Sequence, residues 1–374
     1  MPSLPGPFAA WRVVEVHDLQ VLQALLAPEQ SPRDPEVAAW LEAWPGRRYQ
    51  QRRDDGTELT FVRRLRPRRR ERWGVHALLL ALTLLTTAFA GALLAFDDPL
   101  ALRRAGPEWL AMSVPTRVAP GALLGGLVFS VVMMGVLGGH ELGHYVLARR
   151  HLVDVSPPYF APAPWFLNPI GTFGAFIRLR SPLVNRAVLL DVGAAGPLAS
   201  FVLSIPVTLV GLMLSREYAT PPFSGVRMGI ILGDALLPMG ASPVFSALLA
   251  LSPLRDAGFV HLHPVAVAGW FGFFFTALNL FPVSQLDGGH VAFSLWPRAH
   301  RWVARLTMLL LLAMGLGWGG WWFWALVILV IGRGRLGHPP VVDPHFRLDA
   351  RRRAVAIATL LAFPLSLTPV PFPI

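Results

Sequence analysis

Long apolar runs separated by short polar segments dominate the chain after about residue 75. Apolar runs close to the roughly 20 residues needed to cross a bilayer predict transmembrane helices. We expect seven, at residues 76–96, 121–148, 187–213, 264–282, 303–318, 320–332 and 354–370. Two further apolar pieces, at 229–238 and 243–251, are too short to span and are predicted to be interfacial or re-entrant helices. The pattern predicts an α-helical polytopic membrane protein with about six to seven spans.

Residues 155–180 interrupt this helical pattern. Five prolines exclude a continuous helix there, and the glycines and apolar alternation of residues 171–179 are typical of a β-hairpin. Irregular backbone at membrane depth is tolerated only where protein or a cavity satisfies its amides. We therefore expect a membrane-embedded β-hairpin. Either its edge binds an unwound substrate by strand addition, or the hairpin is a structural plug. The first role would use Gly171, Thr172, Phe173, Gly174 and Ala175.

The first 74 residues differ from the rest because they are charged, contain many prolines and lack a long apolar run. We interpret them as a small cytoplasmic α+β soluble domain, and residues 75–374 as a membrane-embedded domain whose core covers about 120–300. Within the first domain, periodicity predicts strands at 11–16 and 58–62 and short helices at 18–26 and 34–44.

Composition supports membrane insertion. The chain is 54% hydrophobic and only 15% charged. It has no Cys, which excludes disulfides and thiolate metal sites, so any metal must be bound by nitrogen and oxygen atoms. The net charge of +11 comes entirely from arginine. The absence of lysine is a hint of a GC-rich genome, which favours a bacterial source.

The distribution of arginine predicts the orientation of the chain. With seven spans, 27 of the 33 arginines fall on the side of the N-terminus, as the positive-inside rule expects for the cytoplasm. The arginine-rich run at residues 63–72 fits a cytoplasmic stop beside the first span better than nucleic-acid binding. We therefore expect an integral protein of a bacterial inner membrane with a cytoplasmic N-terminus. Lipid is its expected surroundings, and nucleic acid is not an expected partner.

Three ionisable residues lie inside the second predicted span, where such groups are costly unless they have a role. His140 and His144 are four residues apart, so a helix places both on one face, with Glu141 beside them. This is the spacing of two zinc ligands and a general base. The alternative is that ordinary helix packing satisfies both histidines.

A catalytic zinc takes three protein ligands and keeps one position for water. Asp287 is the best third ligand, because it follows the fourth predicted span at a matching depth and precedes two glycines. A surface Asp-Gly turn is the alternative. Asn279 could donate a hydrogen bond to an oxyanion or to the substrate backbone, or could simply cap a helix end. In this scheme zinc lowers the pKa of water toward about 7, and Glu141 takes a proton as water attacks a peptide carbonyl.

Several segments together resemble the site-2 protease family of intramembrane zinc metalloproteases, most like its plant and cyanobacterial branch. They are residues 140–144, 171–175, 191–197 and 276–290. The resemblance covers about residues 120–350. It implies zinc bound by His140, His144 and Asp287, Glu141 as the catalytic base, and Asn279 as a substrate contact. It also implies regulated cleavage of single-span membrane proteins. The chain departs from many members because it leaves no room for a PDZ domain between the motif helices, so residues 1–74 are the candidate for substrate selection.

Two other functions compete with proteolysis. A membrane chaperone or adaptor could retain the fold and bind partner helices without cutting them, but it would have no use for the Glu141 carboxylate. A metal transporter would distribute ionisable residues along a pathway, whereas here they converge at one depth.

Overall fold

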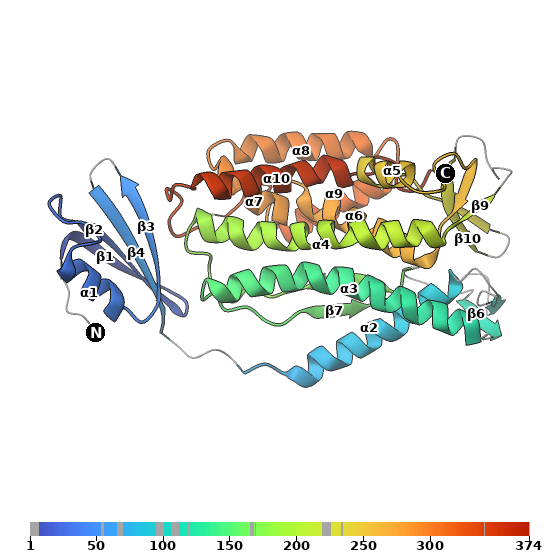
Figure 1. Ribbon diagram of the computed structural model, residues 1–374, viewed down its shortest axis with the longest axis horizontal. Coiled ribbons are helices and arrows are strands. Elements are labelled where there is room, and N and C mark those ends of the chain that lie inside the picture. Colours follow the sequence, from blue (N-terminus) through green and yellow to red (C-terminus); the bar gives the residue numbers. More distant parts are fainter. Residues whose placement is uncertain are drawn as a thin grey trace.

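The computed structural model describes residues 7–53, 56–65, 70–94, 101–105, 112–117, 120–164, 168, 170–218, 226–232, 235–339 and 341–373. An N-terminal sheet lies at one end of the molecule, long helices run side by side along its long axis, and small strands gather at the other end (Figure 1). This arrangement places the two ends of the long helices in different surroundings.

The N-terminal part is a four-stranded antiparallel sheet with one helix. Its strands follow the order β1-β2-β4-β3. The elements are β1 (Phe8–Val16), β2 (Leu19–Leu26), α1 (Pro35–Ala43), β3 (Arg47–Arg53) and β4 (Gly56–Arg64). Aromatic residues of α1 and the sheet form a separate hydrophobic cluster, in which Trp40 contacts Phe8 and Phe61 edge-on. The predicted strands at 11–16 and 58–62 and the helix at 34–44 are confirmed.

The helix predicted at 18–26 is wrong, because this segment is strand β2. β2 pairs with β1 on one edge and β4 on the other, and it is buried on both faces. Leu22 packs among the residues around α1, while Leu19 packs with Val184 of the membrane part. Its two glutamines, Gln20 and Gln23, are three residues apart, so the remaining apolar positions have a spacing that periodicity cannot distinguish from a helix.

Nine helices are described in the rest of the chain. They are α2 (Trp73–Leu93), α3 (Pro120–Arg150), α4 (Arg186–Leu214), α5 (Pro243–Ala250), α6 (Pro264–Leu280), α7 (Asp287–Leu295), α8 (His300–Met314), α9 (Gly320–Ile331) and α10 (Ala350–Ser366). Among the described residues, only α2, α3 and α4 are both long and apolar enough to cross a membrane. The expected spans at 264–282, 303–318, 320–332 and 354–370 are helices of 17, 15, 12 and 17 residues. The count of six to seven spans therefore stays a prediction.

Short strands connect the helices. β5 (Ala101–Ala105) pairs with β6 (Met112–Arg117), and β7 (Tyr159–Pro162) pairs with β8 (Thr172–Phe176). Thus β8 covers the core of the predicted 171–179 hairpin, and its partner strand lies upstream, at 159–162. A second sheet has the order β11-β10-β12-β9. Its strands are β9 (Arg216–Tyr218), β10 (Met228–Leu232), β11 (Ala235–Pro238) and β12 (Phe259–His261).

This second sheet changes one expectation. Within 229–238, β10 and β11 form an antiparallel hairpin with Gly229 opposite Pro238, so the helix predicted there is wrong. The physical reason is the close approach of the strands: a Cβ on Gly229 would lie 2.6 Å from the Leu237 carbonyl oxygen. The piece at 243–251 does form a helix, α5, which begins after the Ser242 cap. Its depth in the membrane stays a prediction.

Helices α3, α4 and α6 pack against one another in the centre of the helical part of the protein. Their contacts bring the C-terminal half of α3, the N-terminal half of α4 and the end of α6 together beside the start of α7. The polar residues of the second span lie at this junction.

Candidate metal centre

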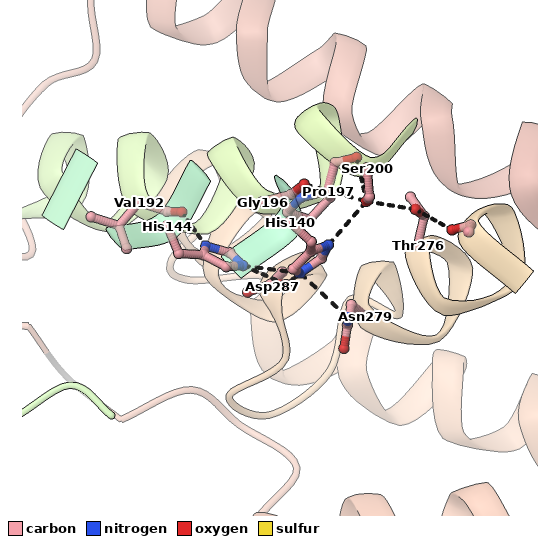
Figure 2. Close-up of polar contacts among 10 residues, drawn as sticks. His140, His144, Val192, Gly196, Pro197, Ser200, Thr276, Asn279 and Asp287 are labelled. Carbon is pink, nitrogen blue, oxygen red and sulfur yellow. Dashed lines mark hydrogen bonds and ion pairs between the residues drawn. The ribbon is translucent and has the colours of Figure 1, made fainter. Parts of the chain in front are cut away.

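Helix α3 places both motif histidines on one face. The Nε2 atoms of His140 and His144 are 3.1 Å apart, and Asp287 Oδ2 lies 3.2 Å from each of them (Figure 2). Asp287 is the first residue of α7, so a segment 143 residues beyond His144 supplies the third group. Both histidines are buried, with exposed fractions of 4% and 6%. The structure therefore brings the three predicted ligands to one point.

The spacing of these three atoms fits a zinc ion. Tetrahedral zinc with bonds of about 2.0–2.1 Å separates its ligand atoms by roughly 3.3–3.4 Å. The observed separations of 3.1–3.2 Å form a nearly equilateral triangle close to this size. Two imidazoles and one carboxylate are also a donor set found at catalytic zinc sites. These residues could hold zinc and leave a fourth position for water.

The Nδ1 atoms of both histidines form hydrogen-bond contacts on the side away from Asp287. His144 Nδ1 donates to the carbonyl oxygen of Val192 at 2.7 Å, and His140 Nδ1 lies 2.9 Å from Ser200 Oγ. Both partners belong to α4 (Figure 2). Because a carbonyl only accepts, the Val192 contact leaves the Nε2 lone pair of His144 free for a metal.

Close approach of α3 and α4 depends on small residues. A Cβ on Gly196 would lie 2.1 Å from His144 Nε2, and a Cβ on Gly143 would lie 2.5 Å from the Ala195 carbonyl oxygen. The small residues Gly193 to Gly196 of α4 include Gly196, which thus packs directly against His144. Any side chain larger than hydrogen at Gly196 would occupy the space of the ligand ring.

Glu141 is buried beside the histidines, with an exposed fraction of 6%. It lines a cleft of about 450 Å³ together with His140, His144 and Asp287. The backbone N–H of Ile177 donates a hydrogen bond to its carboxylate. The carboxylate is therefore anchored on one side and faces the same space as the three candidate ligands.

Asn279 lies near the end of α6 and also lines this cleft. Its Nδ2 is 3.4 Å from His140 Nε2 (Figure 2). An amide at this distance can donate to a group held beside the histidine. Asn279, which the sequence singles out within the fourth predicted span, thus also lies at the centre.

The predicted substrate-binding segment lies only partly at the cleft. Of residues 171–175, Ala175 lines the cleft, and the lining continues through Phe176, Ile177, Arg178 and Leu179. Gly171 instead packs against α2, where its carbonyl oxygen accepts from Thr86 Oγ1 at 2.6 Å. The lining of the cleft therefore begins near the end of the predicted segment, and the role of residues 171–175 in substrate binding stays a prediction.

Sequence reasoning also missed Ser200 and Thr276. Both are buried hydroxyls in apolar helices, and their Oγ atoms are 2.8 Å apart. A serine or threonine in such a helix can donate its hydroxyl to a backbone carbonyl of the preceding turn, as Ser204 does to Ser200. Their type and position alone therefore give no signal that Ser200 contacts His140 and that Thr276 contacts Ser200.

Asp191 does not line the cleft and instead forms polar contacts with His151 and Arg352. Its Oδ2 is 2.9 Å from His151 Nε2 and 2.8 Å from an Arg352 nitrogen. His151 Nδ1 in turn lies 2.9 Å from the Tyr49 hydroxyl of β3. This network joins the N-terminal sheet to the ends of α3, α4 and α10, next to Val192, whose carbonyl holds His144.

Comparison with known proteins identifies the family. The profile described as "Peptidase family M50" matches residues 128–315, half of the chain. The chain belongs to this family. The match contains His140, Glu141, His144, Asn279 and Asp287, and it confirms the resemblance to the site-2 proteases.

Plant proteins of this family are similar to the chain. "Probable zinc metalloprotease EGY2, chloroplastic" of Arabidopsis thaliana is 34% identical over 176 residues, which is 46% of this chain and 29% of that protein. "Probable zinc metalloprotease EGY1, chloroplastic" of Arabidopsis thaliana is 37% identical over 158 residues, 42% of this chain and 27% of that protein. The matched region is less than a third of each relative. No solved structure matches the chain.

Proposed function

We propose that this M50 family member is an intramembrane zinc metalloprotease that hydrolyses peptide bonds within or near the transmembrane segment of single-span membrane proteins. One observation carries the proposal: His140, His144 and Asp287 converge to a triangle of zinc dimensions inside an apolar helix bundle, with Glu141 at the same cleft. The zinc named in its plant relatives supports the choice of metal. A bound zinc would supply a Lewis acid that activates water and polarises the scissile carbonyl.

The chain's own groups would carry out the proton transfers. Glu141 would accept a proton from the attacking water and pass it to the leaving amide nitrogen. Its hydrogen bond from Ile177 would keep the carboxylate at the cleft during both transfers. The Asn279 amide would donate to the substrate carbonyl, because its Nδ2 lies beside the His140 nitrogen that would face the metal.

We propose that β8 and the residues that follow it bind the unwound substrate. A helical substrate hides its peptide groups in its own hydrogen bonds, so cleavage requires an extended segment and a backbone to pair with it. Among the described residues, β8 pairs with β7 on one edge, and Ala175 to Leu179 line the cleft that holds Glu141. Gly171 to Gly174 would then position this strand, and Ala175 would be the first residue to touch substrate.

The N-terminal sheet is a candidate for substrate selection. Its residues contact the membrane part next to the cleft: Ser181 Oγ donates to Asp18 at 2.6 Å, and Arg64 donates to the Leu152 carbonyl at 3.0 Å. A partner bound to this sheet would lie beside the segment 175–179. We further propose that this side is cytoplasmic in a bacterial inner membrane, as the arginine distribution supports.

The test compares the zinc-loaded protein in detergent with its Glu141→Gln variant, using a model single-span substrate. Glu141→Gln keeps the shape of the side chain and all three candidate ligands but removes the base. We expect wild-type cleavage, a loss of roughly 10²–10⁴-fold in the variant, and equal zinc content in both. Cleavage that persists in the variant would refute the protease mechanism. Binding of the substrate without any cleavage by the wild type would favour a chaperone or adaptor.

A further inference from the structure

A chain of buried hydroxyl groups lies behind His140. Its Nδ1 is 2.9 Å from Ser200 Oγ, which is 2.8 Å from Thr276 Oγ1, and Thr276 Oγ1 donates to the Gly272 carbonyl oxygen at 2.7 Å (Figure 2). Ser200 and Thr276 have exposed fractions of 3% and 0%. The chain crosses from α3 through α4 to α6, so it links three of the helices that form the centre.

The direction of this chain follows from the chemistry of its end. The Gly272 carbonyl can only accept, so it takes the single proton of the Thr276 hydroxyl. Thr276 Oγ1 is then an acceptor for the Ser200 proton. Because the O–H of Ser200 is used to donate to Thr276, Ser200 Oγ can only accept a hydrogen bond from the Nδ1–H of His140.

A second path for the Ser200 proton leads to the same result. Ser200 Oγ is 3.1 Å from the Pro197 carbonyl oxygen, which also only accepts. In both cases Ser200 Oγ offers a lone pair to His140 Nδ1. A proton on Nδ1 leaves the Nε2 lone pair of His140 pointing at His144 and Asp287.

Asp287 favours the other tautomer of His140, in which the proton is on Nε2. Its carboxylate oxygen lies 3.2 Å from His140 Nε2 and would attract a proton to that nitrogen. A metal ion between them would engage the same oxygen, and then the hydroxyl chain would be the remaining acceptor for the imidazole proton. The hydroxyl chain of Ser200 and Thr276 thus favours the His140 tautomer that carries its proton on Nδ1 and can bind metal through Nε2.

The two histidines are therefore oriented by different means. His144 donates to a backbone carbonyl, that of Val192, which no side-chain substitution removes. His140 depends on a hydroxyl, which could either donate or accept, and the next groups in the chain decide which. The hydrogen bond that orients His140, unlike the one that orients His144, can therefore be removed by truncating a side chain that touches neither metal nor substrate.

We propose that Ser200, supported by Thr276, is a positioning residue that fixes which nitrogen of His140 faces the metal. This inference rests on the zinc site of the proposed function. Partners that orient metal-binding histidines in this way change metal affinity by roughly 10–100-fold when removed. Ser200 acts through His140 alone, so its removal should weaken metal binding before it changes any step on the substrate.

The test measures the zinc affinity of the full-length protein in detergent by competition with a chromophoric chelator, without substrate. We expect Ser200→Ala to weaken zinc binding by about 10–100-fold. The matched control is Ser204→Ala, one turn further along α4, whose buried hydroxyl donates to the Ser200 carbonyl and is not part of the chain. It should keep wild-type affinity, and thermal unfolding of both variants should show comparable folding.

Variants of Thr276 test the chain even if Ser200→Ala does not fold. Thr276→Ser keeps the hydroxyl and should bind zinc as the wild type does. Thr276→Val keeps the shape but removes the hydroxyl, and we expect a loss of a few-fold, because Ser200 can still donate to Pro197. Equal affinity of Thr276→Val and Thr276→Ser, or of Ser200→Ala and Ser204→Ala, would overturn the proposal. Failure of the wild type itself to bind zinc would instead refute the proposed function.

Discussion

Gly196 is a backbone position at the candidate metal centre that leaves no room for a side chain. An alanine there would place its Cβ 2.1 Å from His144 Nε2, 2.4 Å from Cδ2 and 2.6 Å from Cε1. Ordinary contact needs at least 3.4 Å, so the ring or the helix must shift by about 1.3 Å. The ring cannot simply turn away, because its Nδ1 is held by the Val192 carbonyl at 2.7 Å.

A shift of this size is large on the scale of metal coordination. Metal–ligand distances are reproducible to about 0.2 Å, and a misplacement of roughly 1 Å near reacting groups can reduce a rate by about 100-fold. We therefore expect Gly196→Ala to weaken zinc binding by at least about 100-fold and to reduce proteolysis by at least the same factor.

The assay is zinc affinity by chelator competition, followed by cleavage of a model single-span substrate. Gly135→Ala is the matched control, because it changes a glycine of α3 whose added Cβ would have nothing within 4 Å. This control should retain zinc and activity within about twofold, since an alanine is favourable in a helix. Wild-type zinc affinity and activity in Gly196→Ala would refute the argument that this close approach positions His144.

The chain has no cysteine, so single cysteines report orientation without background. A membrane-impermeant maleimide should label Asp256→Cys in intact bacterial cells but Trp11→Cys only after lysis, and the reverse pattern would refute the proposed orientation. The Arg180 guanidinium, 2.5 and 2.9 Å from the Glu71 carboxylate oxygens, holds the pKa of that carboxyl below its usual value. A lowered pKa stabilises the fold above the unfolded pKa, and this effect is lost as the pH falls through the folded pKa, so Arg180→Gln should lower thermal stability more at pH 7 than at a pH below the lowered pKa of Glu71. An equal loss at both pH values would contradict this linkage.

Local sequence determined the relative placement of His140, Glu141 and His144 in the candidate metal centre. Two histidines four residues apart meet on one face of any α-helix, and Glu141 follows with them, so the pair needs no tertiary information beyond the helix itself. The apolar character of α2, α3 and α4 was equally local, because length and hydropathy predict a span without reference to neighbours.

Segment 18–26 shows where local reasoning fails. Its leucines and valine read as a short helix, yet β1 and β4 bind both of its edges and turn it into a strand. The same holds for 229–238, where strand pairing between Gly229 and Pro238 replaces the expected helix. Short apolar runs are too short for their periodicity to distinguish a helix from a strand, so the segments that pair with them decide which one forms.

By itself the sequence determined the groups available to this M50 family member: two imidazoles and the Glu141 carboxylate on one helix, a distant Asp287, and the long apolar character of the helix that carries the motif. Only the tertiary structure decided that Asp287 lies 3.2 Å from both histidines and that residues 175–179 line the same cleft as Glu141. It also decided that Ser200 holds His140 from behind. The physical reason is that helix geometry is set within one turn of chain. Contacts between α3, α4, α6 and α7 depend instead on how closely their packed surfaces, including Gly196, allow them to approach.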